Sequence, residues 1–517
     1  MTSSVSSSTP VSQPRGLRAA LTSDVGILII IAAVSVILHT VTNGLYGFHR
    51  DELGLLDDAR YLGWGYVSYP PFTPLIARLS LTLFGLWGPG IRFFPTLALG
   101  IVIVLSGLMA RDFGGGRGAQ VVAAIAVAIS PVVMIGNQML HYLSFDYLWW
   151  VVVAACVVRL LRTENPRWWL GVGAGVGLGM MTKYTMAFLA VGLVVGLLLT
   201  PARRYLRTIW PWAGAGLALL IFLPNLIWQV QHSFISLQFL AGIHARDIAW
   251  GRTSGYLIEQ LYASVNPFVL PFVVMGLWFT FFSAQSRRFR MIGWMWLTVA
   301  VLLFLSQGRS YYLAPAYPML IAAGATWGEG WIHGLAPSWL KIARGAVVAL
   351  LILGTIFAIV LLLPIAPVNS GLWKVTSQVN DNIREMVGWP ELVQSVAQVY
   401  NGLPPEEKAH AAIFAGNYGE LGAINLLGPE YGLPEAISGG NSSRYRDYGN
   451  TAPETVVAIG FTRSFLLKDY GSCETGGWLA NPTNVVNEES QFHSEILVCR
   501  EPRQSWQAIR ESLQQFQ

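Results

Sequence analysis

The chain has 517 residues, of which 53% are hydrophobic and only 12% are charged, and its net charge is +5. Soluble domains carry about 25% charged residues, so this composition excludes an ordinary soluble protein and indicates a protein that crosses a membrane many times. Lysine and arginine lie between apolar runs rather than on one patch, which argues against a nucleic-acid-binding protein.

Residues 1–23 begin with a Ser/Thr/Pro-rich stretch, and we expect them to be a disordered cytoplasmic segment. The first apolar run, Val25 to Leu45, is long enough to cross a bilayer, which takes about 20 residues. No small-residue cleavage site follows it, so the run is expected to be a retained anchor rather than a cleaved signal peptide.

Four ionisable residues, His49, Arg50, Asp51 and Glu52, follow this run in the sequence FHRDE. Charges at a membrane edge are functional candidates, although a solvated loop with a chance charge cluster is the alternative. A carboxylate here would act as a general base if burial raised its pKa. Asp51 is the predicted base because it is the first acid after the span, whereas Glu52 is expected to begin a helix.

The segment after FHRDE is predicted to form a short helix lying on the membrane surface. Leu55, Leu56, Ala59 and Leu62 share one face of a helix, as an interfacial helix requires. The pair Pro70-Pro71 is expected to end it, since residues before proline avoid the helical conformation. Residues 45–75 therefore form the predicted catalytic first outer loop.

Ten further apolar runs predict about eleven transmembrane helices over residues 24–365. Residues 168–200 are expected to form two short spans, with one long tilted helix as the alternative. Arginine and lysine fall on every second connection, which the positive-inside rule assigns to the cytoplasm. The remaining connections, which carry the unusual polar residues, then lie outside; they are FHRDE, Gly136–Phe145, Lys183/Tyr184, Gln229–Leu261 and Gln307–Tyr312.

Residues 366–517 contain no spanning run and are predicted to form a small α/β domain on the outer side. Ala411–Phe414 and Thr455–Ile459 are expected to be buried strands, and Asp381–Val387 and Ser505–Phe516 to be helices. We expect Cys473 and Cys499 of this domain to form a disulfide, because that side is oxidising if the orientation is right; two separate thiols are the alternative.

Two outer polar residues are further candidates for acid–base and phosphate chemistry. Asp146 stands at the head of an apolar run and is either a second functional acid or a helix cap. Lys183 interrupts a nearly uncharged stretch, where its ammonium would bind a phosphate or extend to the membrane surface. Asp51, Glu52 and Asp146 together would also suit a divalent metal, which is left open.

The outer turn QGRSYY and the loops beside it supply more candidates. Arg309 suits bidentate contacts with a phosphate, and Tyr312 stands beside it, although two tyrosines here are also typical of an aromatic belt. His141 and Arg246, together with His49 and Arg50, are predicted to contact substrate. Carboxylates on one wall and cations on another would serve a substrate with a phosphate leaving group and a hydroxyl or amine acceptor.

FHRDEL and the following LLDDARYLGWGYVSYPPFTPLIARL resemble the first outer loop of bacterial membrane glycosyltransferases of the dolichyl-phosphate-mannose protein mannosyltransferase type, in the GT-C superfamily. The segments GRSYYLAPAYPML, GNYGELGAINLLGPEYGLP and SGGNSSRY resemble later signatures of that family, so the resemblance covers residues from about 24 to 500. It implies a polyprenyl-phosphate sugar donor, transfer on the outer face of the cytoplasmic membrane, and inversion at the anomeric carbon.

The resemblance also implies roles for single residues. Asp51 matches the base that activates the acceptor, Asp146 matches a second acid, and Lys183 and Arg309 match basic residues that bind the donor phosphate. The acceptor stays open between a lipid, a glycan and a protein; eukaryotic protein mannosyltransferases carry soluble repeats between spans, which this chain lacks.

Two other functions compete with the enzyme. A transporter or flippase of lipid-linked glycans would show polar groups through the membrane depth and paired repeats, and no internal repeat is found. A membrane scaffold has no need of the FHRDE cluster. Polar groups gathered on one side favour the glycosyltransferase.

Overall fold

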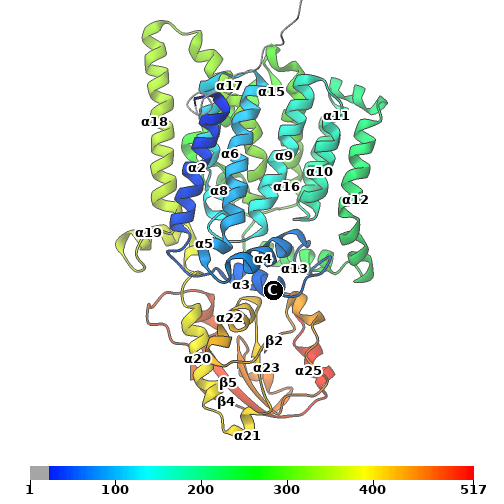
Figure 1. Ribbon diagram of the computed structural model, residues 1–517, viewed down its shortest axis with the longest axis vertical. Coiled ribbons are helices and arrows are strands. Elements are labelled where there is room, and N and C mark those ends of the chain that lie inside the picture. The colour runs from blue at the N-terminus through cyan, green and yellow to red at the C-terminus, as the bar shows by residue number, and fades with distance from the viewer. Residues whose placement is uncertain (1–21, 517) are drawn as a thin grey trace, which may run out of the picture.

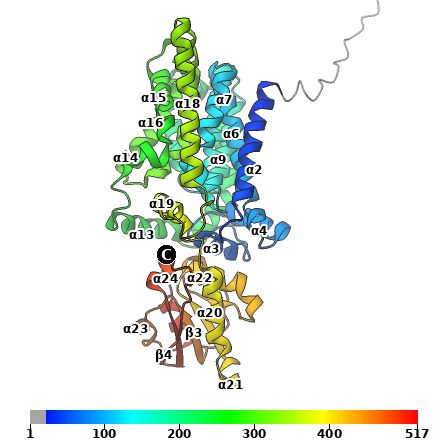
Figure 2. The same ribbon diagram turned by 90° about the vertical axis from the view of Figure 1, so that its left-hand side faces the viewer.

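The computed structural model describes residues 22–516 and has two parts, a bundle of long helices and a smaller domain at one end of it (Figure 1). A layer of short helices lies between the two parts in both views (Figures 1 and 2). The predicted N-terminal segment 1–23 lies almost entirely outside the described residues.

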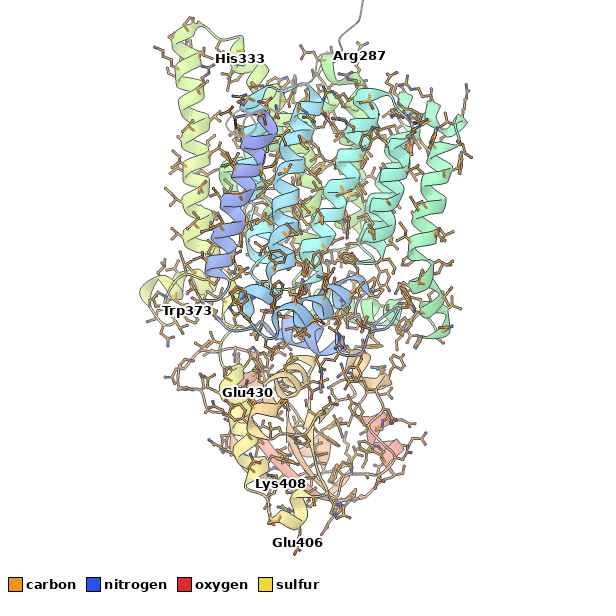
Figure 3. The ribbon with its side chains drawn as sticks, viewed as in Figure 1. Arg287, His333, Trp373, Glu406, Lys408 and Glu430 are labelled. Atoms are coloured by element: carbon orange, nitrogen blue, oxygen red, sulfur yellow. A yellow bond between two sulfur atoms is a disulfide. The ribbon has the colours of Figure 1, made fainter. Side chains whose placement is uncertain are left out.

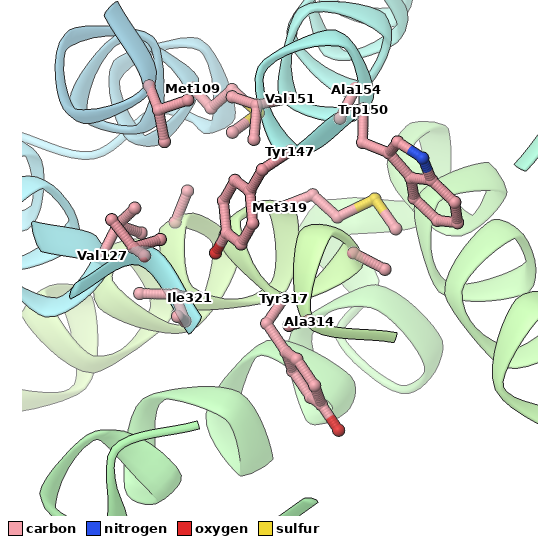
Figure 4. Packing of buried hydrophobic residues seen from close by; sticks show 14 of the residues in the cluster. Met109, Val127, Tyr147, Trp150, Val151, Ala154, Ala314, Tyr317, Met319 and Ile321 are labelled. Carbon is pink, nitrogen blue, oxygen red and sulfur yellow. The ribbon is translucent and has the colours of Figure 1, made fainter. Parts of the chain in front are cut away.

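The bundle is built from helices that run nearly parallel to one axis (Figure 1). In chain order they are α2 (Asp24–Thr42), α6 (Phe93–Phe113), α7 (Arg117–Ala128), α8 (Pro131–Gly136), α9 (Tyr142–Thr163), α10 (Trp168–Met180), α11 (Met186–Leu198), α12 (Trp210–Gln231), α15 (Leu270–Phe281), α16 (Arg290–Leu305), α17 (Tyr317–His333) and α18 (Pro337–Leu362). Their apolar faces pack in the centre, where Tyr147 of α9 lies among Val127, Met319 and Ile321 (Figure 4).

By length and composition, six of the described helices can cross a membrane, or up to eight if each of two bent helix pairs is one span. The protein is therefore a multi-pass membrane protein, but eleven full-length spans are not found among the described residues. Each predicted run does contain helix. Several are short because proline interrupts them, as Pro131 does between α7 and α8 and Pro267 before α15. Residues 168–200 do form two helices, α10 and α11.

Ion pairs gather the arginine-rich connections at one end of the bundle. Asp112 accepts from Arg159 at 2.7 Å and also pairs with Arg162, and Arg117 donates to Asp24 at 2.7 Å. Arg287 and His333 lie at this end, whereas Trp373 and Glu430 lie toward the other (Figure 3). The arginine-rich connections, which alternate with the others along the sequence, therefore lie at one end of the helix bundle.

The layer at the opposite end contains the segments that carried the unusual polar residues. Its helices are α3 (Arg50–Asp58), α4 (Phe72–Phe84), α5 (Gly88–Ile91), α13 (Ile235–Ala249) and α19 (Gly371–Val379). The short helix α14 (Tyr256–Glu259) precedes α15, and the 3-10 turn Ser310–Ala316 precedes α17. The side chains of Leu55, Leu56 and Ala59 are buried in the core. Helix α3 is thus covered on both sides rather than resting on a membrane surface as predicted, and it ends at Asp58, well before Pro70.

The C-terminal domain holds a five-stranded sheet in the order β2-β1-β3-β5-β4. β2, β1 and β3 are parallel, and β5 is antiparallel to both β3 and β4. Strands β1 and β3 coincide with the two predicted strands. The predicted helix Asp381–Val387 is only a 3-10 turn at Asp381–Ile383, and the predicted helix Ser505–Phe516 is the shorter helix α25. The elements are α20 (Trp389–Asn401), α21 (Pro405–Lys408), β1 (Ala411–Ala415), α22 (Tyr418–Leu427), β2 (Ala436–Ile437), β3 (Thr455–Ile459), α23 (Arg463–Leu466), β4 (Tyr470–Trp478), α24 (Glu488–Phe492), β5 (Glu495–Pro502) and α25 (Trp506–Ser512).

A disulfide joins Cys473 to Cys499, which stand directly opposite each other on β4 and β5. It links the edge strand β4 to its neighbour β5. Cys156, in α9, is the free cysteine of the described chain.

Candidate active site

Helix α3 is fixed by a buried ion pair between Glu52 and Arg92. The Arg92 guanidinium donates to both carboxylate oxygens of Glu52, at 3.0 and 2.7 Å, and the exposed fractions of the two side chains are 0% and 1%. Glu52 also accepts from the backbone N–H groups of His49 and Leu140, at 3.2 and 2.9 Å. With these four bonds, Glu52 holds α3 against the 137–141 segment. The structure thus gives Glu52 a positioning role, and its catalytic role stays a prediction.

Asp51, one residue earlier, faces a different environment. The exposed fraction of its side chain is 35%, although the residue lies between the two parts of the protein. The hydroxyl of Tyr418, from the C-terminal domain, donates to Oδ1 at 2.6 Å. The other oxygen, Oδ2, lies 3.8 Å from Nδ1 of His49 and 3.8 Å from Nε2 of His141. Asp51 therefore has one oxygen held by Tyr418 and one facing two imidazoles.

The sequence predicted a raised pKa for the Asp51 carboxyl, and the structure contradicts this. Burial does raise this pKa, but two imidazoles, the Tyr418 hydroxyl and the Arg50 guanidinium lower it by more, so that it falls to about 2. Burial lowers the pKa of His141 to about 4. At pH 7 the site therefore holds an ionised carboxylate beside a neutral imidazole.

Both histidines are oriented because each caps a helix. The backbone N–H of Asp51 donates to Nδ1 of His49 at 3.1 Å, and that of Leu143 donates to Nδ1 of His141 at 3.3 Å. Since Nδ1 accepts, the proton of the neutral His141 ring is on Nε2, the atom that faces Asp51. Sequence analysis assigned these histidines to substrate contact; the structure gives them a capping role as well.

Arg50 points into the C-terminal domain. Its guanidinium pairs with Glu488 and lies 5.0 Å from the centre of the Tyr418 ring. Arg50 therefore links α3 to the domain that supplies Tyr418, and its role in binding substrate stays a prediction.

Two glycines allow α3 and α22 to approach closely. A Cβ atom built on Gly422 would lie 2.4 Å from the carbonyl oxygen of Leu53, and one built on Gly54 would lie 2.7 Å from the Tyr418 ring. Only glycine fits at this separation, which places the Tyr418 hydroxyl on Asp51. Sequence analysis did not identify Tyr418; the signal available was the glycine-rich helix start GNYGELG, with Asn417 and Glu420 in a capping box.

Lys183 lies within a cage of three tyrosine rings. Its Nζ atom lies 5.0, 5.5 and 4.3 Å from the ring centres of Tyr142, Tyr311 and Tyr312. The ammonium is buried and donates no hydrogen bond within the part of the chain that the structure describes. Cation–π attraction compensates the buried charge only in part, so an anion in the cage would compensate it further.

The cage and the carboxylate belong to one site. The Tyr142 ring, on which Lys183 lies, contacts the His141 ring at a centroid distance of 3.8 Å, and His141 faces Asp51. The charge of Lys183 also acts on Asp146. Asp146 accepts from Trp150 at 3.0 Å and from Thr185 at 3.1 Å. It lies inside α9, whose N-cap is His141, so the capping alternative for Asp146 is wrong.

Arg309 is already neutralised. Its guanidinium donates to both oxygens of Asp247 at 2.6 Å, and Arg252 lies 3.7 Å from the same carboxylate. Arg246, one residue before Asp247 on α13, lies 5.1 Å from the Trp250 ring. The buried Nε atom of Arg246, like the Lys183 ammonium, has no hydrogen-bond acceptor among the described residues.

Asp51, Glu52 and Asp146 are not brought together as metal ligands. Among the described residues, the one group of three acids or histidines with ligand atoms within 4.8 Å is Glu420, Glu489 and His493, in the C-terminal domain. The three acids suggested from the sequence therefore do not form a metal site with one another.

Residues 68–228 match the sequence profile of the family described as dolichyl-phosphate-mannose-protein mannosyltransferase, which confirms the family resemblance inferred from the sequence. The match begins after Asp51 and ends in α12. No curated protein matches the chain in a sequence comparison.

Crystal structures of ArnT from Cupriavidus metallidurans share the fold. The structure bound to undecaprenyl phosphate has a TM-score of 0.54 and 16% identity, and the apo structure has 0.56 and 14%; each alignment covers 92% of this chain and 98% of that chain. The oligosaccharyltransferase AglB from Archaeoglobus fulgidus, in complex with an inhibitory peptide and a dolichol-phosphate, is less similar, with a TM-score of 0.49 and 11% identity over 86% of this chain and 70% of that chain. The chain therefore shares its fold with ArnT over nearly its whole length.

The ion pair predicts a large stability difference between two glutamates. Glu52→Ala leaves the buried charge of Arg92 without its carboxylate counter-ion and should cost about 3–5 kcal/mol of unfolding free energy. Thermal unfolding of the purified protein in detergent would show this as a lowered Tm. Glu406→Ala, at an exposed site on α21, is the control and should leave the Tm unchanged. Equal Tm values for the two variants would contradict the role given to Glu52.

Proposed function

We propose that the protein is an inverting glycosyltransferase that moves a sugar from a polyprenyl phosphate to an acceptor hydroxyl or amine at the outer face of the cytoplasmic membrane. The observation that carries this proposal is the pairing of an ionised carboxylate at Asp51 with a buried ammonium at Lys183, joined through the contacting rings of His141 and Tyr142. Glycosyl transfer from a lipid phosphate requires a base for the acceptor and a cation for the leaving phosphate.

The donor phosphate is assigned to Lys183. Its ammonium is buried and the surrounding tyrosine rings provide a weakly polar environment, in which its attraction for an anion is stronger than in water. Arg309 lies beside the cage but is bonded to Asp247, so it contributes a neighbouring positive group rather than a free one. Two observations on other proteins support a lipid phosphate: the matched family is named for dolichyl-phosphate-mannose, and ArnT binds undecaprenyl phosphate.

The acceptor proton is assigned to Oδ2 of Asp51. Oδ1 already accepts a hydrogen bond from the Tyr418 hydroxyl, whereas Oδ2 lies 3.8 Å from an imidazole nitrogen of each of two histidines, His49 and His141. The acceptor oxygen or nitrogen attacks the anomeric carbon as the C–O bond to the phosphate breaks; the acceptor proton passes to Oδ2 and the bonding electrons leave with the phosphate. One displacement with one base inverts the anomeric centre. The low pKa of Asp51 fits a proton that moves late, after the attacking atom has become acidic.

The orientation is part of the proposal. The arginine-rich end is assigned to the cytoplasm by the positive-inside rule. The Cys473–Cys499 disulfide supports an oxidising compartment for the opposite end, where the C-terminal domain and the site lie. Membrane lipid would surround the bundle, and the sugar and the acceptor class stay open.

The role of Asp51 predicts a selective loss of turnover. Asp51→Asn keeps the shape of the side chain but removes the base, so kcat should fall by about 10²–10⁴-fold. The measurement is donor consumption in liposomes supplied with a panel of polyprenyl-phosphate sugars. Binding of undecaprenyl phosphate should change little. Asp381→Asn, on an exposed residue of the same outer side, is the control. Normal turnover by Asp51→Asn would move the role of the base to another acid.

The role of Lys183 predicts weakened binding of the lipid phosphate itself. Lys183→Ala removes one charge-assisted contact and should raise the Kd for undecaprenyl phosphate by about 10- to 100-fold. If the ammonium also stabilises the leaving phosphate, kcat falls as well. Lys341→Ala, at an exposed position on the arginine-rich end, should bind normally. An unchanged Kd for Lys183→Ala would show that Lys183 is only a membrane-edge anchor.

A further inference from the structure

Three ionisable side chains meet inside the C-terminal domain, apart from the site above. Glu420 of α22, Glu489 of α24 and His493 bring their ligand atoms within 4.8 Å of one another. Nδ1 of His493 lies 2.9 Å from Oε1 of Glu420 and 2.9 Å from Oε2 of Glu489. Both glutamate side chains are buried, whereas the exposed fraction of the His493 side chain is 22%. Solvent can therefore reach the group from the side of His493.

The hydrogen bonds within this group do not satisfy both carboxylates. Oε2 of Glu420 accepts from the backbone N–H groups of Gly416 and Asn417, at 2.8 and 3.1 Å. Oε1 of Glu420 is buried, and it lies 2.9 Å from Nδ1 of His493 without forming a well-aligned hydrogen bond among the described residues. The Asn417 amide nitrogen lies 3.1 Å from Oε1 of Glu489 and 3.2 Å from Nδ1 of His493. Nδ1 carries at most one proton, yet two carboxylate oxygens face it.

Two buried carboxylates that share a single imidazole nitrogen are incompletely compensated, and a cation between them removes that cost. We propose that Glu420, Glu489 and His493 bind a divalent transition-metal ion. For metal–ligand distances of about 2.1 Å, two ligands 2.9 Å apart subtend an angle near 90°, as in six-coordinate rather than tetrahedral sites. One imidazole with two carboxylates suits Mn²⁺, Fe²⁺ or Co²⁺, with water completing the coordination on the exposed side of His493.

The metal would act on the proposed active site by positioning. Asn417 caps α22 by accepting from the N–H groups of Gly419 and Glu420, at 2.8 and 2.9 Å, and Tyr418 lies between these residues. Glu488, next to Glu489, pairs with Arg50 of α3. A metal held by Glu420 and Glu489 therefore fixes the two segments of the C-terminal domain that contact α3. This consequence rests on the proposed function, whereas metal binding itself does not.

The test is metal binding by the purified full-length chain, freed of its affinity tag and stripped with a chelator. Titration with Co²⁺ should give one bound ion per chain by elemental analysis, a d–d absorption band with an imidazole contribution, and a raised Tm. His493→Gln should weaken Co²⁺ binding by about tenfold or more. His410→Gln, at an exposed histidine of the same domain, should bind as the unaltered chain does.

A second variant separates loss of a ligand from loss of folding. Glu489→Gln keeps the size of the side chain and should also lose Co²⁺ binding while keeping a cooperative unfolding transition. If the unaltered chain binds no Co²⁺, Mn²⁺ or Fe²⁺ and its Tm does not respond to them, the three side chains form a proton-sharing ion pair and the proposal is wrong. These readouts need no donor, so they stand or fall independently of glycosyl transfer.

Discussion

The structure depends on the buried ion pair between Glu52 and Arg92. A carboxylate and a guanidinium removed from water are tolerated only when their hydrogen bonds are complete, and here Glu52 has four donors. Arg92 also donates to the carbonyl oxygen of Gly47, at 2.7 Å. The pair thus fixes the exit from α2, the start of α3 and the 137–141 segment to one another. Because α3 cannot rotate about this anchor, the adjacent Asp51 is presented toward the site.

A second constraint comes from the C-terminal domain. The close approach of α22 to α3 at Gly54 and Gly422 sets the Tyr418 hydroxyl on Asp51, and the Arg50–Glu488 pair holds the same contact from the other side. Arg446 adds a buried bond to Asp57 at the far end of α3. The domain therefore completes the environment of the candidate base. Its removal would expose Asp51 and free one carboxylate oxygen, rather than merely shorten the protein.

The sequence predicted much of this arrangement because the signals were local. Apolar runs and alternating arginines predict the bundle and its two ends, and FHRDE marks Asp51 without any contact being known. The lone lysine in GLGMMTKYTMAF likewise marked Lys183. The different roles of Asp51 and Glu52 were only partly predictable: adjacent side chains on a helix diverge, but the partner Arg92 stands 40 residues away.

The long-range contacts could not be predicted because the sequence signals are local. Tyr418 reaches Asp51 across 367 residues, and no local pattern encodes that pairing. Helix α3 has the pattern of an interfacial helix, and its polar face is buried only because the C-terminal domain covers it. The pKa of Asp51 depended on neighbours supplied by three separate segments, so burial alone gave the wrong direction. Some apolar runs do not form full-length helices because hydropathy does not register where proline breaks a helix, as at Pro131 and Pro267.

The central claim is that one carboxylate, Asp51, activates the acceptor for a single displacement at the anomeric carbon. The most direct test is the anomeric configuration of the product, determined by NMR, after turnover of the unaltered protein in liposomes with a polyprenyl-phosphate sugar of defined configuration. The account predicts a product with the configuration opposite to that of the donor. A product with retained configuration would require a covalent or double-displacement route and would contradict it.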